Sequence, residues 1–236
     1  SSVLTAKEIE DVVGEPAKQP IRAYASLQSG DTDEARAAVV LRELERTNAF
    51  ERSAIALFSP TGSGYVNYVA SETFEYLTRG DCASFAIEYS VLPSSFSLQA
   101  VPLGTRQTRL VVDGIVERLL TMKPEDRPRF FMFGESLGSQ VSEGMFDDEG
   151  VAGPRGIGLE AGVWIGTPSA TVWRKQLWGT RSIGDESTVG PGDAYLPRNV
   201  ADWHALDESE KQKVRFLLLQ NGDDPIPKFG TRLIWR

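Results

Sequence analysis

Five short runs of apolar residues recur along the chain, at 53–58, 83–89, 129–133, 162–165 and 214–219. They are nearly continuous in apolar side chains and do not alternate with polar ones. Segments with apolar residues at helical spacing lie between them, notably 70–77 and 111–119. Strands of this kind need helices on both faces of a sheet, and the alternating order makes the sheet parallel. We therefore predict an α/β fold with a doubly wound, mostly parallel sheet.

The length of 236 residues suits one sizeable domain better than two average ones. We expect that domain to span residues 31–236. It should begin with a helix near 31–46, where Asp31 can cap the first turn and apolar residues follow at helical spacing. Residues 1–30 contain a short helical pattern and two prolines, so we predict a lead-in segment that packs on the domain.

The segment 167–207 fits the alternation of strand and helix poorly. It contains Trp173, Trp178 and Trp203 among glycines, prolines and acidic residues. A long irregular stretch in a compact domain is often a functional lid. We expect a lid-like insertion over the site, whose tryptophans either pack on an apolar substrate or anchor the insertion to the core.

Composition narrows the possible classes of function. The formal charge of −8 and the pI of about 4.9 argue against nucleic acid as a partner, because that binding requires clustered lysine and arginine. One cysteine, Cys82, and one histidine cannot build a zinc site, and we expect no metal and no cofactor. No run reaches the roughly 20 apolar residues of a membrane span. The start lacks a methionine and a signal-peptide pattern, which predicts a soluble domain cut from a larger protein.

The strongest functional signal is Gly134-Glu135-Ser136-Leu137-Gly138. A Gly-x-Ser-x-Gly sequence places its serine on a sharp turn between a strand and a helix, where the glycines avoid clashes with neighbouring backbone. The apolar run at 129–133 precedes the motif, and a helical pattern at 137–146 follows it. This context predicts an α/β-hydrolase fold with Ser136 as the nucleophile. The alternative is a tight turn with an idle serine.

A serine hydrolase also needs backbone N–H groups that stabilise the oxyanion. The N–H of Leu137, at the start of the predicted helix, is one expected donor. The second should come from the loop after the first apolar run, at Thr61 or Gly62. A phosphate-binding loop is disfavoured there, because the Lys-Ser/Thr ending of a P-loop is missing.

The catalytic acid should follow a late strand, and Asp223-Asp224-Pro225 follows the last apolar run. We expect Asp224 to be the acid, with Asp223 as its rival and an ordinary turn as the alternative. A histidine base should come after the acid, but none of the twelve residues beyond Asp224 is a histidine. His204 precedes the acid and would need an inverted chain order. The simpler hypothesis is that the last strand and its histidine loop lie outside these 236 residues.

Four segments together resemble a family of bacterial, chiefly actinobacterial, membrane proteins with a C-terminal α/β-hydrolase domain. The segments are Ser59-Pro60-Thr61-Gly62-Ser63-Gly64, Glu88-Tyr89-Ser90-Val91-Leu92-Pro93-Ser94, Phe133-Gly134-Glu135-Ser136-Leu137-Gly138-Ser139 and Asp223-Asp224-Pro225. The resemblance runs from about residue 31 to the end. It implies Ser136 as nucleophile, Asp224 as the acid before proline, a histidine further along, and attachment to the cell membrane through a transmembrane region outside this chain. The membrane side stays open.

We therefore predict a serine esterase- or lipase-like hydrolase that cleaves small-molecule or lipid esters through an acyl-enzyme on Ser136. An acyltransferase would share this intermediate and pass the acyl group to an alcohol in place of water. A non-catalytic, membrane-associated binding module of the same fold is the alternative from another class.

Overall fold

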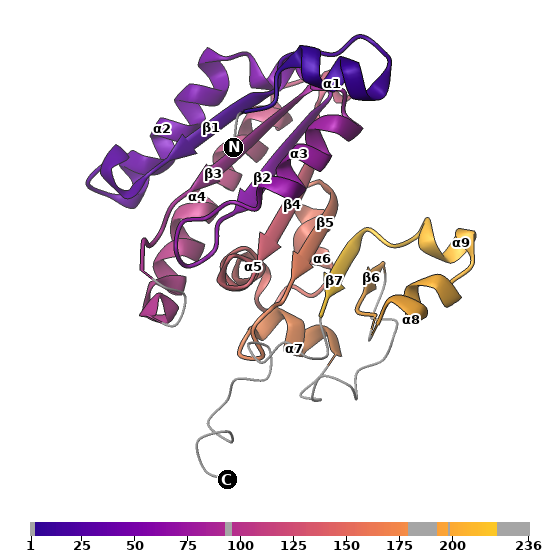
Figure 1. Cartoon of the computed structure of the whole chain (residues 1–236). Helices are drawn as coiled ribbons and strands as arrows, with labels where there is room; N and C mark the ends of the chain where they lie inside the picture. The colour runs from indigo at the N-terminus through magenta and orange to yellow at the C-terminus, as the bar shows by residue number, and fades with distance from the viewer. Residues whose placement is uncertain (1–2, 93–95, 179–192, 198, 221–236) are drawn as a thin grey trace.

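The computed structural model describes residues 3–92, 96–178, 193–197 and 199–220 (Figure 1). Its described strands form one seven-stranded sheet in the order β1-β3-β2-β4-β5-β7-β6, and each pairing is parallel. The strands are β1 (Ile21–Ala25), β2 (Ala54–Ser59), β3 (Cys82–Ile87), β4 (Arg129–Glu135), β5 (Leu159–Ile165), β6 (Ala194–Tyr195) and β7 (Phe216–Leu219). The predicted α/β class with a doubly wound sheet is confirmed.

All five apolar runs are strands, and the two strands that the pattern missed lie at the edges of the sheet. β6 has only two residues. β1 includes Arg22 and Tyr24, so it lacks the continuous apolar character of a central strand. It pairs with β3 from Ile21 opposite Ala83 to Ala25 opposite Ile87. Residues 21–30, expected to be a lead-in, thus begin with a strand of the main sheet.

Three helices, α2 (Asp33–Arg46), α4 (Val101–Leu120) and α5 (Leu137–Glu143), pack on one face of the sheet (Figure 1). Val40 of α2 and Ile115 of α4 share a core cluster with Leu57 of β2, and all three are almost fully buried. Burial of these apolar stripes against the sheet is what holds the helices in place.

The first turn of α2 is capped one residue later than expected. The Thr32 side chain accepts a hydrogen bond from the Ala35 N–H at 3.1 Å, so Thr32 is the cap and the adjacent Asp31 is not. Both residue types cap helices well, which is why the pattern alone chose the wrong neighbour.

The other face of the sheet carries α3 (Tyr68–Leu77), with α1 (Ala6–Val13) beside it. The ring of Phe74 lies 5.9 Å from Phe58 and 5.7 Å from Phe131, measured between centroids. Successive strand residues point to opposite faces, so Phe58 faces α3 while Leu57 faces α2 and α4. Helices therefore cover both faces, as the continuous apolar strands require.

Four shorter helices lie toward the β5, β7 and β6 side of the sheet (Figure 1): α6 (Ala152–Gly156), α7 (Val172–Trp178), α8 (Val200–Ala205) and α9 (Glu208–Lys211). Trp173 of α7 is fully buried, with its ring 5.3 Å from Trp164 of β5 and 5.6 Å from Phe146. Trp173 therefore anchors α7 to the core, which is the second of the two roles expected for the tryptophans. In the described part of the chain, no helix is both long enough and apolar enough to cross a membrane.

Candidate active site

Ser136 lies on the turn between β4 and α5, with φ 54° and ψ −124°. A residue with a side chain rarely adopts positive φ, and such a conformation costs about 1–3 kcal/mol. The Ser136 N–H donates to the Ile165 carbonyl at 2.8 Å, and the Ser136 carbonyl accepts from the Ser139 N–H at 3.0 Å. These bonds hold the partly exposed serine at the end of β4. A strained turn of this kind is what Gly-x-Ser-x-Gly predicts in the α/β-hydrolase fold.

Close packing explains both glycines of the motif. A Cβ on Gly138 would overlap the Ser59 carbonyl oxygen and lie 2.6 Å from the Pro60 carbonyl oxygen. A Cβ on Gly134 would lie 2.8 Å from the Ser139 Cα. The first turn of α5 therefore sits directly on the backbone where β2 ends. This packing brings the start of α5, with Leu137, beside the loop that holds the other expected oxyanion donors.

The loop after β2 distinguishes between the two expected donors. The Thr61 N–H donates to the Tyr65 carbonyl at 2.9 Å, so it is engaged within its own turn. The Gly62 N–H has no hydrogen bond to any residue that the structure describes. The buried Ser97 hydroxyl donates to the Gly62 carbonyl at 2.9 Å and thereby fixes the peptide unit that follows the Gly62 Cα. Gly62 is the better candidate, and Ser97 is a supporting residue that the sequence did not reveal.

The two candidate acids, Asp223 and Asp224, lie outside the described residues. The structure does place the end of β7 next to the serine turn: the Gly166 N–H donates to the Leu219 carbonyl at 2.9 Å, and Gly166 follows Ile165, whose carbonyl binds Ser136. The chain thus leaves β7 at the carboxyl ends of the strands, on the same side of the sheet as Ser136.

His204 lies in α8, away from the serine turn. Its neighbour Trp203 packs on Tyr195 of the edge strand β6, with ring centroids 6.0 Å apart. Three strand spacings, about 14 Å, separate β6 from β4. His204 is also exposed to solvent. This arrangement does not bring His204 and Ser136 together.

A buried carboxyl group, Glu143 of α5, connects the serine helix to the strand ends. The Thr167 hydroxyl donates to Glu143 Oε1 at 2.6 Å, and the Gln220 amide donates to the Thr167 carbonyl at 3.2 Å. Glu143 and Thr167 are fully buried. Burial raises the pKa of Glu143 to about 8, although the Thr167 hydrogen bond and the positive charge of Arg174 act to lower it. The network ties α5 to Gln220, the residue directly after β7.

Glu143 makes stability depend on pH. Its folded pKa lies above the ordinary value of 4.5, so folding becomes less favourable as pH rises from about 4.5 to about 8. Glu143→Gln keeps the neutral form and should be more stable than the wild type at pH 8, by about 4 kcal/mol, with little difference near pH 4.5. Urea unfolding at both pH values measures this. Glu117→Gln, on the exposed side of α4, is the matched control, and parallel pH curves for wild type and Glu143→Gln would contradict the account.

The one cysteine of the chain, Cys82, is not a candidate nucleophile. Cys82 begins β3 and is fully buried, and burial raises its pKa to about 11, with a Thr78 hydrogen bond acting in the opposite direction. A thiol with so high a pKa is a poor nucleophile at neutral pH. Across the described ranges, no three His, Cys, Asp or Glu side chains are grouped as a metal site needs.

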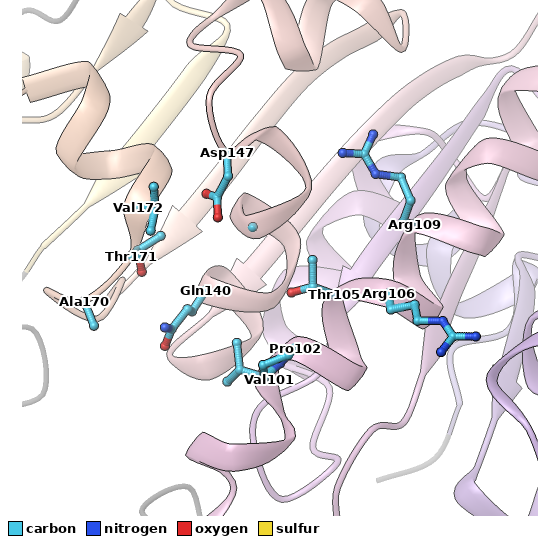
Figure 2. Close-up of a pocket in the computed structure, with 11 residues that line it drawn as sticks. Val101, Pro102, Thr105, Arg106, Arg109, Gln140, Asp147, Ala170, Thr171 and Val172 are labelled. Atoms are coloured by element: carbon cyan, nitrogen blue, oxygen red, sulfur yellow. The ribbon is translucent and has the colours of Figure 1, made fainter.

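A pocket of about 490 Å³ lies beside the serine helix, between α4, α5 and the turn that leads into α7 (Figure 2). Its walls include Val101 of α4 and Gln140 of α5. Val101 packs in one cluster with Leu137, the residue after Ser136. Gln140 follows Ser136 by four residues, and its N–H donates to the Ser136 carbonyl at 3.4 Å. The pocket therefore opens about one helical turn from Ser136.

A strained serine turn at the end of a central strand, in a parallel sheet covered on both faces, defines an α/β-hydrolase domain. Residues 21–236 match a sequence family described as "Alpha/beta-hydrolase family", and the chain belongs to that family, which makes it a hydrolase. The match starts at Ile21, where β1 begins. No curated protein and no solved structure gave a significant match.

Proposed function

We propose that this hydrolase cleaves carboxylic esters through an acyl-enzyme formed on Ser136. The observation that carries the proposal is the strained Ser136 turn, whose helix packs at Gly138 on the backbone that leads to Gly62. A nucleophile and two backbone N–H donors, from Leu137 and Gly62, then surround one position for a carbonyl group. Such an arrangement favours the tetrahedral intermediate of acyl transfer.

The reaction proceeds in two balanced steps. A base takes the Ser136 proton while Oγ bonds to the ester carbonyl carbon, and the N–H groups of Leu137 and Gly62 bind the oxyanion. The C–O bond to the alcohol then breaks, and the alcohol leaves with the proton. Water adds to the acyl-enzyme in the same way and releases the acid and free Ser136.

The proposed acid is Asp224, with Asp223 as the alternative, and its role is to orient a histidine base. We propose that this base is a histidine outside these 236 residues, because His204 lies in α8, whose Trp203 packs on the edge strand β6. Lipid esters as substrates and attachment to the cell membrane of bacteria are further proposals, supported by the resemblance of the four sequence segments.

Trapping the acyl-enzyme tests the proposal. The full-length protein is mixed with p-nitrophenyl butyrate, quenched in acid and weighed by mass spectrometry, and we expect one butyryl group on the wild type and none on Ser136→Ala. Adding an alcohol distinguishes the two chemistries: free butyric acid as the main product indicates hydrolysis, and a new butyryl ester indicates acyl transfer. A protein that neither acquires the butyryl group nor releases p-nitrophenol would be a non-catalytic binding module of the same fold.

His204→Gln should leave ester hydrolysis within about twofold of the wild type, because His204 does not lie near Ser136. Loss of a general base lowers rates by about 10²–10⁴-fold, so the two outcomes are well separated. Initial rates with p-nitrophenyl butyrate measure the effect, and the melting temperature shows that the variant is folded. A fall of 100-fold or more in a folded variant would assign the base to His204.

A further inference from the structure

Two residues that line the pocket beside the serine helix each have a buried polar atom without a partner in the described part of the chain. Thr171 Oγ1 and Gln140 Oε1 have no hydrogen-bond partner within the described residues, and Thr171 is only 2% exposed. Both residues line the pocket (Figure 2). A buried polar atom without a partner destabilises the fold, so such atoms beside a pocket indicate a ligand that completes their hydrogen bonds.

The Thr171 and Gln140 oxygens differ in the hydrogen bonds that they can form. The Thr171 hydroxyl can both donate and accept, whereas the Gln140 carbonyl oxygen only accepts. A ligand with hydroxyl groups satisfies both, because each hydroxyl can donate to one partner and accept from another. An alkyl chain would leave both atoms unsatisfied. The polar atoms therefore favour a hydroxylated group over a fatty chain in this pocket.

The charged residues of the pocket argue against an anionic ligand. The guanidinium of Arg106 pairs with Glu34, and that of Arg109 donates to the Met145 carbonyl, so the positive charge left at the pocket is balanced by Asp147. The Asp147 carboxylate lines the pocket and would repel an anion (Figure 2). A carboxylate is at the same time a good acceptor for a neutral hydroxyl.

The remaining walls suit a ligand with apolar faces as well as hydroxyl groups. Val101, Pro102 and Val172 line the same pocket. Sugar rings and glycerol present C–H groups between their hydroxyls, and apolar side chains pack on those groups. The pocket has a volume of about 490 Å³, which lies in the usual range for small-molecule sites, about 300–1,000 Å³.

We propose that this pocket binds a neutral polyhydroxylated group, of the sugar or glycerol type, as the alcohol portion of the ester that Ser136 cleaves. The proposal rests on the proposed function for its reaction and on Thr171 and Gln140 for its specificity. The scissile ester then lies at the Val101 end of the pocket, next to Leu137, and the hydroxyl groups extend along α5 toward Gln140.

Three butyrate esters test the substrate class, because they share the acyl group and differ in the alcohol: glucose 6-butyrate, glycerol 1-butyrate and ethyl butyrate. Thr171→Val and Gln140→Leu should each lower kcat/KM for a polyol butyrate at least tenfold more than for ethyl butyrate, mainly through KM. Thr171→Ser keeps the hydroxyl and should restore most of the preference. The polyol ester that shows this effect identifies the sugar or the glycerol as the source of the hydroxyls.

Equal losses for all three esters, or no loss for any, would overturn the substrate class and leave the serine mechanism intact. If no ester is hydrolysed, direct binding decides. Saturation-transfer NMR of Ser136→Ala with methyl glucoside and with glycerol should then show a signal that Thr171→Val removes. Such a signal without hydrolysis would support the pocket while the proposed function fails, and its absence would overturn the pocket.

Discussion

Replacing Ser136 with alanine is expected to abolish labelling of the full-length protein by a fluorescent fluorophosphonate and to lower ester hydrolysis by about 10³-fold or more. The reason is that Oγ forms the covalent bond to both the probe and the acyl group. The substitution should leave the fold intact, because Ser136 is partly exposed and its turn is held by backbone hydrogen bonds that alanine can also make.

Ser139→Ala is the matched control for that experiment. Ser139 lies three residues further along, and its hydroxyl donates to the Ile165 carbonyl at 3.1 Å. Removing this bond should lower stability by about 1 kcal/mol and leave labelling in place. Equal labelling of Ser136→Ala and the wild type would remove Ser136 from the mechanism.

Gly138→Ala is expected to lower both stability and reactivity. The new Cβ would overlap the Ser59 carbonyl oxygen, and neither the helix start nor the end of β2 can move without breaking sheet or turn contacts. We expect a loss of about 3 kcal/mol in the free energy of unfolding. Displacing the Gly62 loop from Ser136 should also slow fluorophosphonate labelling by about 100-fold or more.

Gly156→Ala serves as the control for the glycine substitution. Gly156 is exposed, ends α6, and has no atom within 4 Å of an added Cβ. Its stability should stay within about 0.5 kcal/mol of the wild type. Chemical unfolding and labelling rates of the two variants measure the difference. A Gly138→Ala protein as stable and as reactive as Gly156→Ala would contradict the packing of α5 against β2.

The central part of the fold could be predicted because its strands are buried on both faces and their apolar runs are continuous. The edge strands could not be predicted, because an edge strand has a neighbouring strand on one side only and is less fully buried. Its apolar run is therefore interrupted by polar residues. β1 carries Arg22 and Tyr24 for this reason, and the two residues of β6 carry no pattern at all.

The serine turn could be predicted because its requirements are local: two glycines and a serine within five residues. The residues that support it depend on contacts between distant segments. Ser97 lies 35 residues from Gly62, and Glu143 lies 24 residues from Thr167. A short-range pattern contains no signal for such pairs. The same holds for the pocket, which Gln140 and Thr171 line together only after α7 has packed on the turn at 144–146 that follows α5.

Locating the fluorophosphonate adduct tests the central claim most directly. The labelled full-length protein is digested with trypsin, and the peptide that begins at Phe130 is fragmented, which separates Ser136 from Ser139 and Ser142. We predict a single adduct on Ser136. An adduct on another residue, with Ser136 unmodified, would contradict the assignment of the nucleophile and with it the proposed mechanism.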